Sequence, residues 1–588
     1  MPGFIIHIGN EPFLFSEETR PKLVVERILG PNYTVERRVV NKFMNDRVFV
    51  NEEDFVVVVE GVVLNNHQLV EKYKARDWQH CIVEMYKLCG DAFFSEFRGS
   101  FSGALFDKKK DKWIVYTGHT GEKQVFYAKT PEGYLFGSEM RFMVETLKKN
   151  SLPVTIDEIG AYLSLSNGFC IEDRTLVEEV HKLIAGNYIC LTSDDFEIIK
   201  YHRFSNRPNN SITQEEAIDN IDRLFRQAIK RQFEKDKEYG YRHLACLSGG
   251  LDSRMTVWVA HDMGYTDQTN IDFSQSGYWD FKISQDIAID LHHDYFFHAL
   301  DGGDFIPRYC FNSAITYGSG LLLGHGYSME QFINYDTFGI MHTGQIGDAI
   351  LGTFFKKNEY NLEIKLEQGA YSRIMLDRLA DYQFVEHYEN EEIFCLYSRA
   401  FTGANQGLLS FQENTESYSP FTDVDFLEYC YSIPLSLRFN HKIYIDWILA
   451  RYPGAAEYVW EKIGRKISPL ENIPIRSMRV FGYEVPHYSD PRFKVYLKSF
   501  FLRRLGIIKK EGTRSHSKAI VSGMNPIDSW YHNNPNVRGF VDRFWLENKA
   551  VVPYDRLRAD MELLMEGEAV YEKLQCCNVL SAIKLILT

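Results

Sequence analysis

The chain lacks several features that would assign it to particular classes of protein. Its 588 residues contain no uninterrupted apolar run of about 18 residues, so a membrane-spanning helix is not expected. The ten cysteines are scattered without a CxxC pair, which predicts reduced thiols and a cytoplasmic location. The stretch from Met1 to His7 has no basic region followed by an apolar run, so a secretory signal is not expected either.

The chain also lacks an excess of positive charge. There are 66 Lys and Arg residues against 80 Asp and Glu, and the resulting net charge of -14 argues against binding to a nucleic-acid backbone. Low-complexity segments and internal repeats are missing, and hydrophobic residues make up 45% of the chain. The composition therefore predicts a folded chain of two to four domains.

The first third of the chain is rich in strand signals. β-branched and aromatic runs at Phe55–Leu64, Phe101–Phe106 and Trp113–Tyr116 predict strands, and helical periodicity follows at Gln68–Leu88 and Glu139–Leu147. This pattern predicts a layered α+β domain. A polar stretch over residues 205–211 then precedes an amphipathic helix that opens at Thr213, and we place a domain boundary there.

Beyond that boundary, strands, loops and helices alternate. Strands are predicted at His243–Leu247, Ile271–Ser274 and Gly339–His342, and a helix follows each of the first two. This alternation is typical of a parallel, doubly wound sheet, which binds ligands at the carboxyl ends of its strands. From about Glu359 the pattern becomes mostly helical.

The first of these loops, Leu247-Ser248-Gly249-Gly250-Leu251-Asp252-Ser253, suits an anion. Adjacent glycines let the backbone approach a pyrophosphate, the next helix directs free N–H groups at it, and two hydroxyls add donors. Asp252 would repel phosphates unless a metal lay between them, which predicts a Mg²⁺ ligand. From the loop alone, a simple helix-capping turn is an equally good interpretation.

The whole string matches the SGGxDS loop of the ATP pyrophosphatases, and the chain resembles the asparagine synthetase family over about residues 1–470. Further blocks in the family's order are Phe101–Asp107, His119–Tyr127, Phe136–Arg141, Phe273–Leu291, Gly344–Gly352, Glu416–Asp423 and Val459–Gly464. The resemblance implies an α+β Ntn-hydrolase-like αββα sandwich over residues 1–203. It also implies an α/β, Rossmann-like ATP-pyrophosphatase domain over residues 204–476, and we assign residues 477–588 to a helical extension of unknown role.

The resemblance also implies roles for individual residues. Asp348 would be the second Mg²⁺ ligand beside Asp252, and Lys462 and Gln345 would take the catalytic positions. ATP would be bound by Leu247, Ser248, Gly249, Gly250, Asp252, Ser253, Phe273, Gln275 and Gly344. ATP and Mg²⁺ are therefore the expected cofactors.

Several positions depart from the family's pattern. Pro2 stands where the glutaminase nucleophile is a cysteine, the run Glu60-Gly61-Val62 replaces Asn-Gly-Glu, and Arg98 replaces an aspartate. These changes predict an inactive glutaminase domain. In the synthetase half, Gln345 replaces a glutamate and Tyr418 an arginine, so the acceptor and amine pockets look altered while the adenylation residues are kept.

We therefore predict a C–N ligase that adenylates a carboxylate, releasing pyrophosphate, and passes the acyl group to an amine not made by its own first domain. β-Lactam synthetase and the lasso-peptide macrolactam synthetases share such losses. The alternatives are asparagine synthesis from aspartate and ammonia, or a nucleotide-binding pseudoenzyme. The acid could be a small molecule, a peptide or a sugar acid, no nucleic-acid or membrane partner is expected, and a homodimer is left open.

Overall fold

The computed structural model describes residues 3–309, 332–469 and 523–588, apart from residues 12, 19 and 21, together with the backbone of two short strands, β20 (Met478–Val480) and β21 (Tyr483–Val485). Pro2 lies outside the described residues, as does the predicted domain boundary at residues 476 and 477. None of the described helices is long and apolar enough to cross a lipid bilayer. The nine described cysteines are all free.

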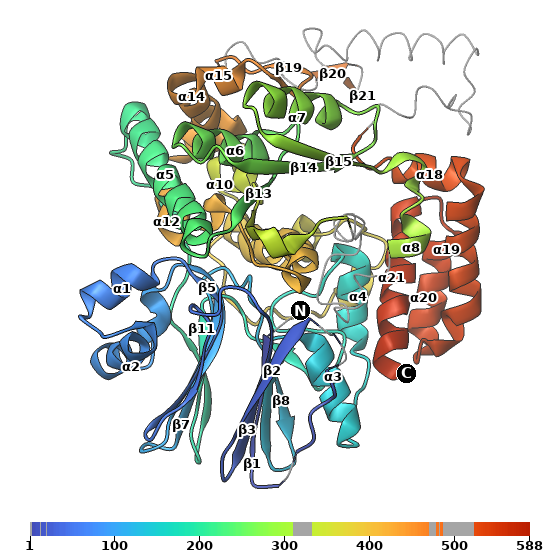
Figure 1. Ribbon diagram of the computed structural model, residues 1–588. Coiled ribbons are helices and arrows are strands. Elements are labelled where there is room, and N and C mark those ends of the chain that lie inside the picture. The colour runs from blue at the N-terminus through green and yellow to red at the C-terminus, as the bar shows by residue number, and fades with distance from the viewer. Residues whose placement is uncertain are drawn as a thin grey trace.

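The N-terminal part consists of two antiparallel sheets stacked face to face (Figure 1). One sheet has the order β10-β8-β9-β1-β3-β2 and the other the order β12-β11-β7-β6-β5-β4. Their strands are β1 (Gly3–Gly9), β2 (Leu23–Leu29), β3 (Tyr33–Val40), β4 (Val48–Asn51), β5 (Phe55–Val63), β6 (Gly99–Asp107), β7 (Lys112–Thr117), β8 (Phe126–Thr130), β9 (Gly133–Gly137), β10 (His181–Lys182), β11 (Asn187–Leu191) and β12 (Phe196–Lys200).

Strand β5 shows how the sequence builds these layers. Because side chains alternate along a strand, Val56 and Val58 pack between the two sheets, whereas Val57 and Val59 pack under the outer helices. Those helices are α1 (Asn66–Lys72) and α2 (Trp78–Cys89) on one side and α3 (Met140–Lys149) and α4 (Glu158–Asn167) on the other. The predicted αββα sandwich is therefore confirmed.

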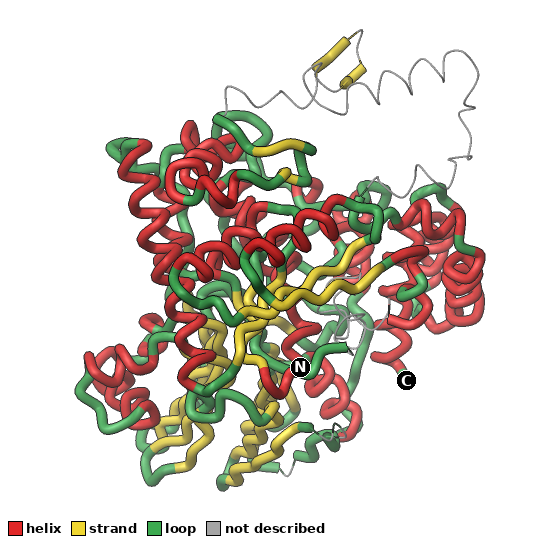
Figure 2. Tube along the Cα trace, turned by 45° about the horizontal axis from the view of Figure 1, so that its top comes forward, coloured by secondary structure: helices red, strands yellow, loops and turns green. Residues whose placement is uncertain are grey.

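A five-stranded parallel sheet follows, with the order β15-β14-β13-β16-β17. Figure 2 shows its strands running through the middle of the molecule with helices to either side. Its strands are β13 (Arg242–Cys246), β14 (Gln268–Ser274), β15 (Asp294–Ala299), β16 (Phe338–His342) and β17 (Ser417–Tyr418). The predicted Rossmann-like sheet is confirmed, and the three strands expected from the sequence are its central ones.

Both faces of this sheet are covered. Ala245 packs with helices α6 (Leu251–Asp262) and α7 (Trp279–Asp290), while its neighbour Leu244 packs with the 3₁₀ helix η8 (Ala404–Glu413). The long helix α5 (Gln214–Glu238) begins at the expected Thr213, whose side chain and that of Glu216 form a capping box.

Residues 523–588 of the C-terminal part form a group of α-helices (Figure 1). They are α18 (Ile527–Asn533), α19 (Pro535–Asn548), α20 (Asp555–Glu566) and α21 (Val570–Leu587). Helix α21 packs on α4 of the N-terminal part, and the Tyr162 hydroxyl donates to Asp560 at 2.8 Å. The three parts of the chain therefore share one continuous apolar core.

Candidate active site

A cavity of about 810 Å³ lies where strands β13, β14 and β16 end. Two loops form much of its wall, residues 247–250 between β13 and α6 and residues 343–346 between β16 and α10 (Gly347–Leu351). Since β13 and β16 are neighbours in the sheet, both loops meet at one edge. This is the place where parallel α/β sheets bind their ligands.

The first loop is held in a tight turn by its own side chains. The hydroxyls of Ser248 and Ser253 are 2.9 Å apart, and the Ser253 hydroxyl accepts a hydrogen bond from the Ser248 N–H. The Gly249 N–H donates to Asp280 at 2.9 Å, and a side chain on Gly249 would collide with that carboxylate. Gly250 lines the cavity, and a side chain there would meet the Ser248 hydroxyl at 3.4 Å, an ordinary contact distance.

The two predicted metal ligands lie side by side. The carboxylate of Asp252 accepts hydrogen bonds from the Asp348 N–H and from the Tyr444 hydroxyl, each at 2.9 Å. Burial and the neighbouring Asp348 raise the pKa of Asp252 to about 8. Two carboxylates at adjacent strand ends are oxygen donors of the kind that Mg²⁺ binds, so the residues present fit that ion.

The second loop must approach helix α6 very closely. A side chain on Gly344 would lie 2.2 Å from the Ser253 nitrogen, so only glycine fits there. Ile346 has a left-handed backbone with a φ of 61°, a strained conformation of the kind found at functional sites. The packing of these loops brings Asp348 to Asp252.

Lys462 lies next to the paired carboxylates. Its ammonium group is 3.7 Å from Asp348 and 3.4 Å from the His441 ring. The charge of Lys462 also acts to lower the pKa of Asp252. The structure therefore places the predicted lysine beside Asp348, although Lys462 is not among the residues that line the cavity.

The other predicted residues divide into two groups. Leu247, Phe273, Gly344 and Gln345 all line the cavity, and the Gln345 amide donates to the Ala404 carbonyl. Gln275 does not line the cavity. Its side-chain oxygen accepts a hydrogen bond from the Trp530 indole of helix α18 at 3.1 Å, so it joins the sheet to the C-terminal helices.

Two residues outside the sequence motifs, Arg254 and Tyr444, hold the site together. Arg254 is fully buried and donates to the Gly249 carbonyl at 2.9 Å and to the Val459 carbonyl at 2.7 Å. It thereby ties the first loop to the segment that carries Lys462. The sequence does contain one indication of the role of Arg254, because a charged residue on the buried face of helix α6 needs hydrogen-bonding partners. Nothing near Tyr444 in the sequence predicts its contact with Asp252.

A second cluster of potential metal ligands lies beneath the sheet. One atom each of Asp236, His243 and His342 lie within 4.8 Å of one another, all buried. The Asp236 carboxylate already accepts hydrogen bonds from both rings, at 2.9 Å and 2.7 Å. We interpret this cluster as a link from α5 to strands β13 and β16.

Among the positions that depart from the family's glutaminase pattern, Glu60, Val62 and Arg98 are described, and they lie at contacts between the N-terminal domain and the part that contains the parallel sheet. Glu60 forms an ion pair with Arg47 at 3.2 Å, and Arg47 also pairs with Glu416 just before β17. Lys123 joins the same cluster at 2.9 Å from Glu416. All four side chains are at most 5% exposed.

Two more of these positions extend the contact. Arg98 pairs with Asp425 of helix α12 (Val424–Ser432) at 3.0 Å. Val62 and Tyr418 pack in one apolar cluster that also contains Ile340. Charged and apolar contacts between the two parts therefore occupy positions where the resemblance would place glutamine-binding groups.

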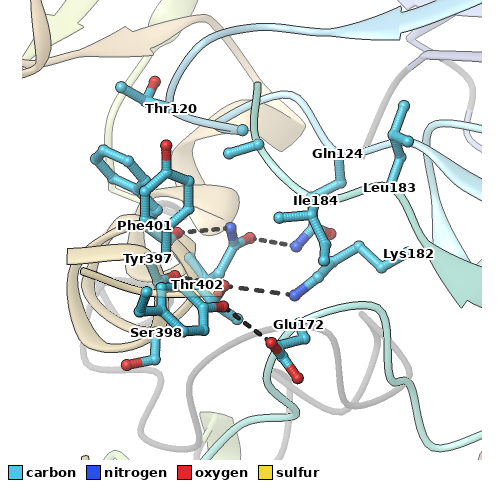
Figure 3. Close-up of a pocket in the computed structure, with 14 residues that line it drawn as sticks. Thr120, Gln124, Glu172, Lys182, Leu183, Ile184, Tyr397, Ser398, Phe401 and Thr402 are labelled. Carbon is cyan, nitrogen blue, oxygen red and sulfur yellow. Dashed lines mark hydrogen bonds between the residues drawn. The ribbon is translucent and has the colours of Figure 1, made fainter. Parts of the chain in front are cut away.

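A small cavity of about 20 Å³ lies in the same interface (Figure 3). Figure 3 shows Lys182 and Gln124 of the N-terminal domain facing Thr402 and Phe401 of the π-helix η7 (Leu396–Gly403). The Lys182 ammonium group makes a long hydrogen bond of 3.5 Å to Thr402, and burial lowers its pKa to about 8. The volume is enough for about one water molecule.

Comparison with known proteins agrees with both halves of this architecture. Residues 44–202 match the model of the glutamine amidotransferase domain, and residues 220–322 match that of asparagine synthase. These matches support the resemblance to the asparagine synthetase family over those two segments.

Individual relatives match over part of their length. A putative glutamine-hydrolysing asparagine synthetase of Methanocaldococcus jannaschii is 25% identical over 44% of this chain and 52% of its own length. Asparagine synthetase 3 of Bacillus subtilis is 22% identical over 35% of this chain and 34% of its own. The chain thus spans about half or less of these relatives. Among solved structures, glutamine phosphoribosylpyrophosphate amidotransferase of B. subtilis matches 41% of this chain and 51% of its own, at 10% identity and a TM-score of 0.21.

Proposed function

We propose that this protein is an ATP-dependent ligase that adenylates a carboxylate and joins the acyl group to an amine. The observation that carries the proposal is the meeting of Asp252 and Asp348 beside the glycine turn of residues 248–250 and the first turn of α6. This arrangement supplies N–H and hydroxyl donors for phosphates and a carboxylate pair for a divalent cation.

The proposed reaction has two steps. A substrate carboxylate oxygen attacks the α-phosphorus of ATP, forming an acyl-adenylate and expelling pyrophosphate, and an amine then displaces AMP to form the amide. Mg²⁺, which Asp252 and Asp348 are suited to hold, would neutralise charge on the phosphates. Lys462 would stabilise charge that develops on the same groups.

Two features, Gln345 and the N-terminal domain, indicate which amine the protein uses. An amide cannot act as a base, but Gln345 can orient an amine by hydrogen bonding. Because the glutamine-binding positions are occupied by Glu60, Val62 and Arg98, we propose that the N-terminal domain packs against the synthetase part and hydrolyses no glutamine.

A panel assay tests this function. Pyrophosphate release from ATP and Mg²⁺ is measured with a set of carboxylic acids, each with ammonium, with an alkyl amine or with glutamine, for the wild type and for Asp252→Ala. We expect release that requires one class of acid and Asp252, and no glutamate from glutamine. Release with aspartate and ammonium would identify an asparagine synthetase, and binding of ATP without release with any acid would contradict the ligase.

A further inference from the structure

Arg399 is the only Lys or Arg among the described residues that line the main cavity. Three carboxylates share the wall, those of Asp252, Asp272 and Asp348. Lys462, the cation at the carboxylate pair, is not part of this lining. The cavity thus has a single basic side chain available to a bound molecule, and it comes from a part of the chain far from the phosphate loop in sequence.

Within the part of the chain that the structure describes, the Arg399 guanidinium donates no hydrogen bond and forms no ion pair with an acidic side chain. It lies over the face of the Tyr371 ring, 5.6 Å from the ring centre. The side chain is half-buried. A guanidinium withdrawn from water without an acceptor is costly, and its planar donors match a carboxylate or phosphate in two places.

The local backbone gives a second indication. Arg399 lies in η7, a π-helix, a conformation that occurs frequently at functional sites. This helix separates the two cavities: Arg399 and Ala400 line the large one, whereas Tyr397, Phe401 and Thr402 line the small one in Figure 3.

Apolar and small residues form much of the rest of the cavity wall. Phe354, Tyr371, Leu408 and Phe411 contribute to it, together with the small residues Ala400, Ala404 and Gly407. Such a surface suits a hydrocarbon or aromatic body, and the unpaired guanidinium suits an anionic group attached to it.

We propose that Arg399 determines specificity by binding a second anionic group of the acid substrate, and that this acid carries an apolar or aromatic body in addition to its two acidic groups. The proposal rests on the proposed function for the identity of the activated carboxylate. Removing a charge-assisted hydrogen-bonding partner should weaken binding roughly 10- to 100-fold.

The test uses two acids that differ by one carboxylate. Phenylsuccinate and 3-phenylpropionate are titrated calorimetrically into the wild type, Arg399→Ala, Arg399→Lys and Arg373→Ala, a nearby exposed arginine outside the cavity wall. We expect the wild type and Arg373→Ala to prefer phenylsuccinate, Arg399→Ala to lose the preference, and Arg399→Lys to retain part of it. Equal binding of the two acids to the wild type, no binding of phenylsuccinate, or an unchanged preference in Arg399→Ala would overturn the proposal.

The same variants separate this proposal from the ligase itself. Binding that depends on Arg399 without pyrophosphate release from any acid would leave the anion site standing and remove the ligase. Conversely, Arg399→Ala could release pyrophosphate with the same KM for the acid as the wild type. That result would support the proposed ligase function and refute the role of Arg399. A changed KM for ATP alone would assign Arg399 to the nucleotide and overturn the proposal as well.

Discussion

The N–H of Asp348 donates a 2.9 Å hydrogen bond to the carboxylate of Asp252, although the two residues lie 96 positions apart. This contact joins the loops after two neighbouring parallel strands and creates the paired carboxylates of the proposed site. The arrangement depends on Gly344, because any side chain there would collide with helix α6.

Removing either carboxylate should abolish adenylation while leaving the fold intact. We expect Asp252→Asn and Asp348→Asn each to lower pyrophosphate release at least about 100-fold, because the charge facing the phosphates is lost. The control is Asp262→Ala at the other end of α6, which should retain activity. Full activity in both Asn variants, with unfolding curves like those of the wild type, would contradict the metal assignment.

The buried ion pairs between the N-terminal domain and the synthetase part should be sensitive to the loss of one partner. Arg47→Met leaves Glu60 and Glu416 without their guanidinium, and we expect a loss of about 3–5 kcal/mol in the free energy of unfolding. The matched control, Arg451→Met, breaks an exposed pair with Asp219 and should cost less than about 1 kcal/mol. Denaturant unfolding measures both, and similar small losses would argue against the buried cluster as a structural link.

Glu122 should make the protein less stable as the pH rises. Burial raises its pKa to about 8 from an ordinary value of 4.5, so the folded state keeps a proton that the unfolded state has lost. Glu122→Gln should therefore unfold like the wild type near pH 4.5 and become progressively more stable than it up to about pH 8. Thermal unfolding across this range tests the prediction, and a stability difference that does not change with pH would refute it.

Lys182 should show the opposite dependence. Burial lowers its pKa to about 8 from 10.5, so below pH 8 the folded state holds a poorly solvated charge. We expect Lys182→Met to be more stable than the wild type at neutral pH and this advantage to shrink between about pH 8 and 10.5. Equilibrium unfolding in denaturant at several pH values measures it, and an advantage that grows with pH would contradict the assignment.

Local patterns in the sequence predicted much of the fold. A run of β-branched residues identified strand β5, and the capping residues Thr213 and Glu216 located the start of α5. The helical periodicity at Gln68–Leu88 gave a less exact result, because the structure contains two helices there. The chain turns between them, where Lys74 has a φ of 52° and Asp77 caps the second helix.

Local sequence patterns could not predict contacts between segments that lie far apart in the chain. The hydroxyl of Tyr444 reaches Asp252 across 192 positions, and the indole of Trp530 reaches Gln275 across 255. The contact between Gln275 and Trp530 could not be predicted, because the C-terminal helices lie outside the resemblance, and the place of Gln275 beside the nucleotide stays a prediction. The sequence could not predict the proposed role of Arg399, because that role depends on the folded arrangement, in which Arg399 lines the cavity and no described acidic side chain pairs with it.

The most direct test of the proposed chemistry follows an oxygen atom. An acid that supports pyrophosphate release is labelled with ¹⁸O in its carboxylate, and the AMP formed with ATP, Mg²⁺ and an amine is analysed by mass spectrometry. If the carboxylate attacks the α-phosphorus, each AMP molecule formed by the wild type should contain one ¹⁸O atom. The Asp252→Ala variant should form no labelled AMP. Unlabelled AMP, or label found in inorganic phosphate instead, would contradict the acyl-adenylate and with it the central claim.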